Sequence, residues 1–444
     1  MLMRALGALV FIGMVLAACS FSKTMNGDGV KGGRGEGAIG RRGERATERR
    51  GEEAMGRLGE GEKDRRGEEV MGRGGDGGIL TGADQTQIYV PLLNGKTVGV
   101  VANQTSIICN THLVDSLLKL GIKVKRVFGP EHGFRGNAEA GATIGNSIDE
   151  RTGLPVVSLY GSHKKPTKED LQGIDIMIFD IQDIGVRCYT YISTLTYVME
   201  SCAEANIPLI VFDRPNPNGY FIDGPVLEPQ QVSFVGLHAV PLVYGLTIGE
   251  YATMVNGEGW LEKDLKCDLT VIKLKNYNHS SRYALPVKPS PNLPDMASIY
   301  LYPSLCLFEG TVISVGRGTN MPFRVFGHPD LPHEGFSFKP MPIKGVSDHP
   351  PCEGKICYGT DLTADADSLR VHGHLELSYL ISSYNLLKSK GQFFNDFFAK
   401  LAGTAELRRQ IEAGASEAQI KNTWKPGIDK YKKMRKKYLL YPEI

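Results

Sequence analysis

An alternation of short apolar segments with helical patterns runs through residues 97–212 and constrains the fold more than any other feature of this sequence. Each apolar segment has the length of one buried strand, and chains that alternate strands with helices build βαβ units and a parallel sheet. The sequence therefore predicts the α/β class. The five predicted strands span residues 97–102, 124–128, 155–159, 174–179 and 208–212.

Helical patterns complete this prediction. Residues 113–120 form an amphipathic helix before Gly121, and residues 188–205 carry apolar side chains at core-facing spacing. Further along, Thr247-Ile-Gly-Glu250 has the spacing of a capping box, so Glu250 is first a helix cap and only second a catalytic candidate. Another strand is predicted at 268–274, and residues 376–440 are mostly helical in pattern.

Polar and ionisable residues follow all five predicted strands. They occupy residues 103–105, 129–136, 160–163, 180–187 and 213–219. The carboxyl ends of parallel strands meet at one edge of a sheet, and open α/β sheets bind ligands there. Any one of these clusters could be turn chemistry, since Pro, Asn, Asp and Gly form turns, but five together favour a binding rim.

Motifs for several other chemistries are absent from the sequence. No Gly-x-Gly-x-x-Gly follows the first strand, and there is no P-loop, His-Glu-x-x-His or Gly-x-Ser-x-Gly. We therefore expect no cofactor and no metal ion. The charge balance of 51 Lys and Arg against 49 Asp and Glu gives a net charge of +2, which argues against a nucleic-acid partner.

The N-terminus has the pattern of an export signal. Arg4 precedes an apolar run of 14 residues, 5–18, which is shorter than the ~20 that a membrane-spanning helix needs. The run ends in Leu16-Ala-Ala-Cys19, which resembles the bacterial lipobox. We expect residues 1–18 to be a lipoprotein signal peptide and Cys19 to be lipidated, so that the protein is exported and anchored to the cell envelope, in the periplasm or at the outer membrane. The alternative is an ordinary signal peptide with an incidental cysteine.

Residues 19–84 are predicted to be a disordered tether. Residues 21–80 hold 18 glycines, 13 basic and 12 acidic residues, and four octets of the type RRGEEAMG begin at Arg41. Too few apolar residues are present to bury a face, so ordering the segment would cost entropy without compensation. A tail that binds the wall or a partner is the alternative.

The seven cysteines that follow Cys19 do not form a disulfide framework, because their number is odd and they are scattered. Most are predicted to be buried thiols. Cys352 and Cys357 lie close together in a turn-rich stretch and are the best candidates for a bridge.

Six motifs resemble one bacterial family over about residues 88–444. They are GPEHGFRG, DIQDIGVRCYTYI, DRPNPNG, PSPNLP, YPSLCLFEGT and SVGRGT, in this order. They are similar to those of the NamZ-type exo-β-N-acetylmuramidases, long catalogued as a domain of unknown function. The resemblance implies a Rossmann-like domain, assigned to residues 85–285, and a smaller C-terminal α/β domain, assigned to 286–444, with the active site in the cleft between them.

The activity implied by the resemblance is hydrolysis that removes N-acetylmuramic acid from the non-reducing end of peptidoglycan-derived glycan, in cell-wall turnover or recycling. A non-catalytic lipoprotein that binds cell-wall sugar in the same cleft is the alternative function. An amidase or peptidase is disfavoured because the sequence has no metal or nucleophile motif.

Glycoside hydrolysis needs a carboxylic acid that protonates the leaving oxygen. Glu131 is the predicted general acid because it follows a strand on a turn directed at the rim; the alternative is an ion pair with Arg135 or Arg187. The second catalytic group stays open, since the substrate's own 2-acetamido group could serve as nucleophile with a carboxylate orienting it. Its candidates are Asp180, Asp183 and Glu309.

The lactyl carboxylate of N-acetylmuramic acid requires a cation, for which Arg is the usual choice. Arg187 is favoured over Arg214 and Arg317 because it lies on the turn that enters a helix; alternatively it neutralises Asp180 and Asp183. The predicted substrate-binding residues are Asn103, His132, Arg135, Arg187, Arg214, Asn216 and Arg317.

Overall fold

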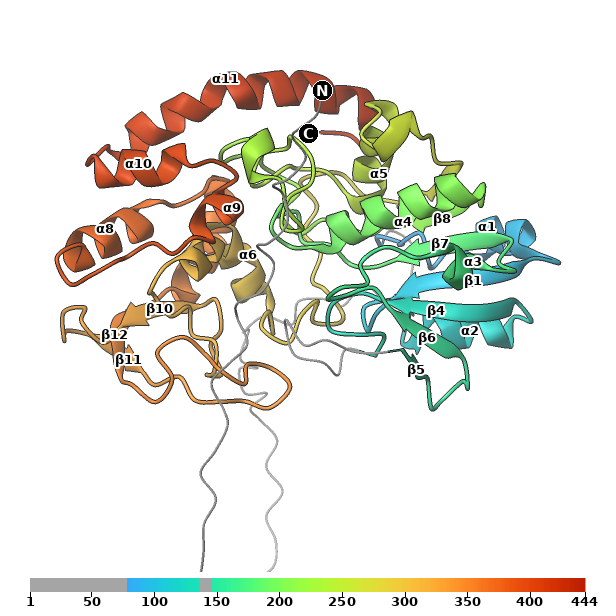
Figure 1. Cartoon of the computed structure of the whole chain (residues 1–444), viewed down its shortest axis with the longest axis horizontal. Helices are drawn as coiled ribbons and strands as arrows, with labels where there is room; N and C mark the ends of the chain where they lie inside the picture. The colour runs from blue at the N-terminus through green and yellow to red at the C-terminus, as the bar shows by residue number, and fades with distance from the viewer. Residues whose placement is uncertain (1–77, 136–145, 444) are drawn as a thin grey trace, which may run out of the picture. The chain divides into compact units, whose positions relative to one another are not determined.

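A seven-stranded sheet with the strand order β5-β6-β4-β1-β7-β8-β9 organises the N-terminal half of the described chain (Figure 1). The computed structural model describes residues 78–135 and 146–443. All neighbouring strands are parallel except β5 and β6. The strands are β1 (Thr97–Ala102), β4 (Lys123–Gly129), β5 (Ser147–Ile148), β6 (Pro155–Ser158), β7 (Ile176–Asp180), β8 (Leu209–Phe212) and β9 (Leu269–Ile272), and β2 (Ile107–Ile108) pairs separately with β3 (Thr111–His112).

Helices cover both faces of this sheet, which is why its strands are apolar throughout. All six residues of β1 are buried. Val98 and Val100 pack in one apolar cluster with α1 (Thr86–Leu93) and α2 (Leu113–Lys119). Val101 points to the other face, where the cluster includes α4 (Tyr191–Ala205) and α5 (Ile248–Gly257). The short helix α3 (Lys168–Leu171) lies between β6 and β7 in the chain.

The C-terminal half has a smaller sheet than the N-terminal half and more of its residues in helices. Its antiparallel sheet has the order β10-β12-β11, with β10 (Val325–His328), β11 (Phe336–Phe338) and β12 (Cys357–Asp361). Its helices are α6 (Met296–Leu305), α7 (Ala366–His372), α8 (Ser378–Leu387), α9 (Phe398–Ala402), α10 (Glu406–Glu412) and α11 (Glu417–Arg435), and a 3₁₀ turn, η3 (Cys306–Gly310), follows α6. The predicted fold class, a parallel-sheet α/β domain with a smaller C-terminal α/β part, is confirmed.

Local sequence signals set several helix starts. The capping box predicted at Thr247 is present: the Thr247 hydroxyl accepts from the Glu250 backbone, and the Glu250 carboxylate accepts from the Thr247 backbone. Asp295 and Ser416 begin α6 and α11 in the same way. Glu250 is therefore a cap, and it also accepts hydrogen bonds at Oε1 from the Leu440 backbone.

The body includes residues that precede Gln85. Leu80 and Lys275 exchange backbone hydrogen bonds of 3.2 and 3.0 Å, and the Thr81 hydroxyl donates to Asp84 at 2.7 Å. The predicted signal peptide (1–18), the Cys19 lipidation site and the tether up to residue 77 lie outside the described residues.

The C-terminal segment returns to the large sheet. At the end of α11, the Tyr431 hydroxyl donates to the Tyr244 carbonyl at 2.7 Å. The Tyr441 hydroxyl then donates to the carboxylate of Asp213 at 2.5 Å and accepts from the Leu274 backbone at 2.9 Å. The last residues of the chain thus hold the carboxyl ends of β8 and β9.

Truncating Tyr441 is expected to destabilise the protein. Tyr441→Ala removes a buried ring and a donor to Asp213, a fully buried carboxyl whose pKa burial raises to about 7. We expect the free energy of unfolding to fall by about 3 kcal/mol, and by about 1 kcal/mol for Tyr441→Phe, in urea titrations. Tyr438→Phe is the control, because its hydroxyl donates to Glu258 near the surface. Equal losses in all three variants would contradict this role.

Two further observations concern the cysteines and the membrane. All seven cysteines after Cys19 are free thiols, so the candidate bridge between Cys352 and Cys357 is not formed. Five of the seven are buried, as predicted: Cys188, Cys202, Cys267, Cys306 and Cys357. Within the described part of the chain, no helix combines the length and the apolar composition that crossing a bilayer requires.

Candidate active site

A pocket of about 220 Å³ lies where the loops after β4, β6 and β7 meet the C-terminal half. Glu131 and His132 come from the first of these loops, and Glu309 and Arg317 come from the segment that follows α6. The other lining residues are Tyr160, Cys188, Tyr189, Thr190, Tyr191, Phe234, Val235, Ser290, Asn292, Leu293, Tyr302, Phe323, Phe397 and Leu401.

A tight turn after β4 places Glu131 in the pocket wall. The Gly133 backbone donates to the Pro130 carbonyl at 2.9 Å, and His132 takes a left-handed conformation with φ +69°. The Glu131 carboxylate accepts a hydrogen bond of 2.9 Å from the hydroxyl of Thr190, the residue that begins α4. The hydrogen bond therefore holds the carboxylate beside the N-terminal end of α4, a helix of 15 residues.

Tyrosines and a histidine line much of the pocket. The pKa values of Tyr191 and Tyr160 are raised, mainly by burial and secondly by the charge of Glu131. The Tyr189 hydroxyl donates to the Pro289 carbonyl at 2.8 Å, and the Ser290 hydroxyl lies 3.3 Å from Nε2 of His132. These groups form a polar and aromatic surface of the kind that binds a small polar ligand.

Arg317 and Glu309, both from the segment that follows α6, form an ion pair that lines the pocket. The Arg317 guanidinium lies 2.5 Å from Oε1 of Glu309 and 5.2 Å from the centre of the Phe323 ring. Burial is the largest single effect and by itself would lower the pKa of Arg317, but the neighbouring acidic groups, chiefly Glu309, together raise it. Arg317 is therefore a fixed cation that faces the pocket.

The backbone of the SVGRGT motif explains why Arg317 is held there. Gly316 and Gly318 both have positive φ, +76° and +79°. A Cβ at Gly316 would lie 2.6 Å from the Met321 carbonyl oxygen, and one at Gly318 would lie 2.5 Å from that of Met341. Only glycine fits at both positions, so the two glycines flanking Arg317 set the loop that carries it.

The structure brings four of the predicted site residues to the pocket: Glu131, His132, Glu309 and Arg317. Asn103 lies one contact away, because its side-chain amide donates to the Tyr191 hydroxyl at 3.0 Å. The remaining predicted residues occupy other positions, where each has partners of its own.

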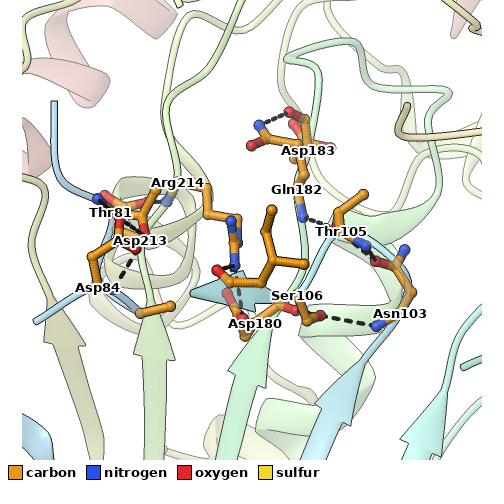
Figure 2. Close-up of polar contacts among 12 residues, drawn as sticks. Thr81, Asp84, Asn103, Thr105, Ser106, Asp180, Gln182, Asp183, Asp213 and Arg214 are labelled. Carbon is orange, nitrogen blue, oxygen red and sulfur yellow. Dashed lines mark hydrogen bonds and ion pairs between the residues drawn. The ribbon is translucent and has the colours of Figure 1, made fainter. Parts of the chain in front are cut away.

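Asp180 and Arg214 pair with each other at the carboxyl ends of the strands (Figure 2). Nε and Nη2 of Arg214 donate to the two carboxylate oxygens of Asp180 at 2.6 and 2.8 Å, and both side chains are at most 2 % exposed. Figure 2 also shows Asn103, Thr105 and Gln182 linked beside this pair. This pair is a buried part of the sheet edge and does not line the pocket.

Asp183 is buried among backbone and tyrosine donors. The Gly185 backbone donates to its carboxylate at 2.7 Å, and the Tyr244 hydroxyl donates to the same oxygen. Burial nevertheless raises the pKa of Asp183 to about 6. It has the raised pKa that a general acid requires, but it does not line the pocket.

Asp183 is expected to make stability depend on pH. Its folded-state pKa is raised above 3.8, so its stabilising contribution is complete below that pH and is lost as pH rises through about 6. The quantity to follow is the free energy of unfolding of the wild type minus that of Asp183→Asn. This difference should fall by on the order of 2–3 kcal/mol between pH 4 and pH 7. Asp175→Asn is the control. The carboxylate of Asp175 accepts a hydrogen bond from the Thr97 backbone, which lowers its pKa, so the same difference in unfolding free energy for Asp175→Asn should stay constant between pH 4 and pH 7. A flat difference for Asp183 would show that it stays ionised.

The position of Arg187 does not support its predicted role in binding a substrate carboxylate. It is fully buried, and its guanidinium donates to the carbonyls of Pro225, Val240, Leu401 and Ala402 at 2.7–3.0 Å. Burial lowers its pKa to about 10. Two of these carbonyls end α9, so Arg187 joins the N-terminal half to the C-terminal half and does not neutralise the two aspartates.

Arg135 and Asn216 also have structural partners. Arg135 lies 2.7 Å from Asp149 and 3.3 Å from Asp115. The Asn216 amide donates to the Leu246 carbonyl at 2.8 Å, and its oxygen accepts from the Asn218 backbone. Neither side chain lines the pocket, so the predicted contacts of these residues with substrate are not supported.

Sequence reasoning missed most of the aromatic lining. Tyr189 and Tyr191 lie in the quoted motif DIQDIGVRCYTYI, so the two alternating tyrosines at the start of α4 were a usable signal. Phe234 and Phe397 lie in segments that carry no motif, and only the folded chain brings them to the pocket. Within residues 78–135 and 146–443, no group of three or more His, Cys, Asp or Glu side chains could hold a metal ion.

Comparisons with known proteins agree with this architecture. Residues 98–297 match the N-terminal model, and residues 300–441 the C-terminal model, of the exo-β-N-acetylmuramidase NamZ family. The peptidoglycan β-N-acetylmuramidase NamZ of Bacillus subtilis (strain 168) is 41% identical over 377 residues, which cover 80% of this chain and 89% of the relative.

Two crystal structures of DUF1343 family proteins from Bacteroides fragilis are also similar. One is 44% identical with a TM-score of 0.77, and the other is 28% identical with a TM-score of 0.69. Each comparison covers 82% of this chain and 99% of the other. Both family models, arranged in order along the chain, and the relative at 41% identity show that this chain belongs to the NamZ family of exo-β-N-acetylmuramidases.

Proposed function

We propose that this protein is an exo-acting glycosidase that removes β-1,4-linked N-acetylmuramic acid from the non-reducing ends of peptidoglycan fragments. The observation that carries the proposal is one pocket that contains a carboxyl group on a strand-end turn, Glu131, and a fixed cation, Arg317. A glycosidase needs a carboxyl group to protonate the leaving oxygen, and a site for a sugar that carries a carboxylate needs a cation. The relative in Bacillus subtilis, named as a peptidoglycan β-N-acetylmuramidase, supports the same substrate class.

In this mechanism Glu131 is the general acid. Its proton passes to the glycosidic oxygen as the bond to the anomeric carbon breaks, and the oxygen leaves as the hydroxyl of the next sugar. Thr190, which donates to the carboxylate, orients it. The neighbouring hydroxyl of Tyr160 adds to the polar surroundings of this group.

Glu309 is the best-placed candidate for the second group. Asp180 and Asp183 do not line the pocket, whereas Glu309 does and is held by Arg317. A carboxylate there would orient the substrate's 2-acetamido group, whose oxygen bonds to the anomeric carbon as the glycosidic bond breaks, or it would act on that carbon directly. Water then attacks the anomeric carbon, returns a proton to the Glu131 carboxylate and releases N-acetylmuramic acid. Arg317 would bind the lactyl carboxylate.

We further propose that the protein is exported and lipid-anchored through Cys19, and that it acts in cell-wall turnover or recycling. The support for this is the leader and the lipobox-like Leu16-Ala-Ala-Cys19. Growth with labelled palmitate tests the anchor: the label should be incorporated into the wild type and be lost in Cys19→Ala. Equal labelling of the two would reject it.

The activity is tested by incubating the protein with the disaccharide N-acetylmuramyl-β-1,4-N-acetylglucosamine and following both free sugars by mass spectrometry. Release of the two sugars in equal amounts supports the proposal. With longer fragments, only the terminal muramic residue should appear first, as exo action requires. Binding of the disaccharide without release would instead indicate the non-catalytic sugar-binding alternative.

A further inference from the structure

The lining of the pocket changes from buried to exposed side chains, and this gives the pocket a direction. His132, Tyr189 and Tyr191 are buried at one end. Tyr160 and Phe234 are half-buried, and Phe397 is 43% exposed. Glu131, Glu309 and Arg317 line the same pocket and are also half-buried. The pocket therefore has a closed end, lined by buried side chains, and an open end, where Phe397 is exposed to solvent.

Three aromatic residues form the open end, and we call them the aromatic mouth: Tyr160, Phe234 and Phe397. They come from three distant segments, namely the loop after β6, a turn closed by two 2.9 Å hydrogen bonds between Ser233 and Gly236, and the start of α9.

The Phe234 ring is held from several sides. The Tyr160 and Phe234 rings lie 6.5 Å apart at 61°, and Tyr197 stacks near Phe234 at 6.1 Å and 12°. The ammonium group of Lys164 lies 4.6 Å from the centre of the Phe234 ring. Phe234 is therefore fixed in place at the mouth, which is the condition for a ring to serve as a preformed binding surface.

Phe397 differs from Phe234 because the fold leaves it exposed. An exposed phenylalanine is common by itself, but this one lines a pocket together with two other aromatic residues. Aromatic rings at a pocket mouth present flat apolar faces to whatever passes through it. A pyranose ring has one face of C–H groups that matches such a surface, and its hydroxyl groups can stay in water at its edge.

We propose that the aromatic mouth is the binding site for the leaving-group sugar, a neutral N-acetylhexosamine on the reducing side of the bond that is cut. This inference rests on the proposed function and extends it. The terminal sugar must fill the closed end because the glycan cannot continue there. The next sugar then lies at the open end, past Glu131, where the rest of the glycan extends into solvent.

The site acts by stacking on the leaving sugar. Binding energy gained there is available only when the substrate carries that sugar, so the aromatic mouth raises kcat/KM for a disaccharide and not for a glycoside with a small leaving group. It also orients the glycosidic oxygen toward the general acid.

The test uses two substrates of N-acetylmuramic acid: the β-1,4 disaccharide with N-acetylglucosamine, and the methyl β-glycoside, whose leaving group cannot stack. Free N-acetylmuramic acid is measured from both. Phe234→Ala and Phe397→Ala should each lower kcat/KM for the disaccharide roughly tenfold and change that for the methyl glycoside less than about twofold. Phe234→Tyr and Phe397→Tyr keep an aromatic face and should restore activity on the disaccharide.

Phe336→Ala is the matched control, because Phe336 is a half-exposed phenylalanine of β11 that does not line the pocket. It should leave both substrates unchanged. Inhibition by free N-acetylglucosamine gives an independent readout, and it should weaken in the two alanine variants and not in the control.

Three results would overturn the inference. Equal losses on both substrates would mean that the rings support the fold or the closed end. No loss on either would mean that they do not touch the leaving sugar. Cleavage of neither substrate by the wild-type protein would reject the proposed function itself, and binding of the disaccharide measured by calorimetry separates that case from the others.

Discussion

Replacing Glu131 by glutamine is expected to lower kcat for the disaccharide by about 10²–10⁴. The amide has the size of the carboxyl group and keeps an oxygen that can accept from Thr190, but it has no proton to give to the leaving oxygen. Turnover is measured as release of free N-acetylmuramic acid. The thermal unfolding midpoint should stay near that of the wild type, because the change is isosteric at a half-buried position.

The leaving group provides the control for this prediction. A substrate with a good leaving group, such as a nitrophenyl glycoside, needs little protonation, so Glu131→Gln should retain much more activity on it than on the disaccharide. Thr190→Val, which removes only the hydroxyl that donates to Glu131, should have a smaller effect on the disaccharide. Near-wild-type turnover of the disaccharide by Glu131→Gln would remove Glu131 from the role of acid.

Replacing Arg317 by methionine is expected to abolish most of the preference for the muramic β-glycoside over the corresponding glucosamine β-glycoside. The two sugars differ by the 3-O-lactyl group, whose carboxylate would pair with Arg317 in the wild type. Truncating one partner of a buried charge pair costs on the order of 3–4 kcal/mol, so the ratio of the two kcat/KM values should fall about 10²–10³-fold. The ratio is the quantity to measure, because a general loss of activity cancels in it.

Glu309 requires its own control, since Arg317→Met also leaves this carboxylate without its ion pair. The double variant Arg317→Met/Glu309→Gln removes both charges and should show the same loss of preference. Glu309→Gln alone should keep the preference. If Arg317→Met reduces both substrates equally, Arg317 supports the site and does not recognise the lactyl group.

Arg187→Met provides a contrast with Arg317→Met. Arg187 donates to four carbonyl groups in the interior, and four acceptors would be left without this donor. Its loss should lower the unfolding midpoint, whereas Arg317→Met should mainly change substrate preference.

Local patterns predicted the scaffold well. The strand predicted at 97–102 is β1 with the same bounds, because a short, mainly apolar segment between polar turns is typical of a strand buried on both faces in this class of fold. The capping box at Thr247 formed as predicted, since it needs only residues three positions apart. Glu131, predicted at the rim of strand ends, lies in the pocket wall, and its turn is set by the adjacent residues of GPEHG.

The choice among the arginines could not be predicted in this way. Arg187, Arg214 and Arg317 each lie within one of the six motifs, and the sequence does not indicate which of them would reach the pocket. Arg214 lies 34 positions from its partner Asp180, and Arg187 lies more than 200 positions from two of the carbonyls that it holds. Contacts between residues so far apart in the sequence form only when the chain folds, so the sequence by itself does not reveal them.

The sequence by itself determined the α/β class, the motif set that places the chain in its family, and the turn that carries Glu131. All three depend on short-range periodicity and on residues close together in the chain. The tertiary structure alone decided that Arg317 is the cation in the pocket, that Asp180 and Asp183 do not line it, and that Phe234 and Phe397 do. The physical reason is that a buried charge is committed to whichever partners surround it, and those partners come from distant segments that only folding brings together.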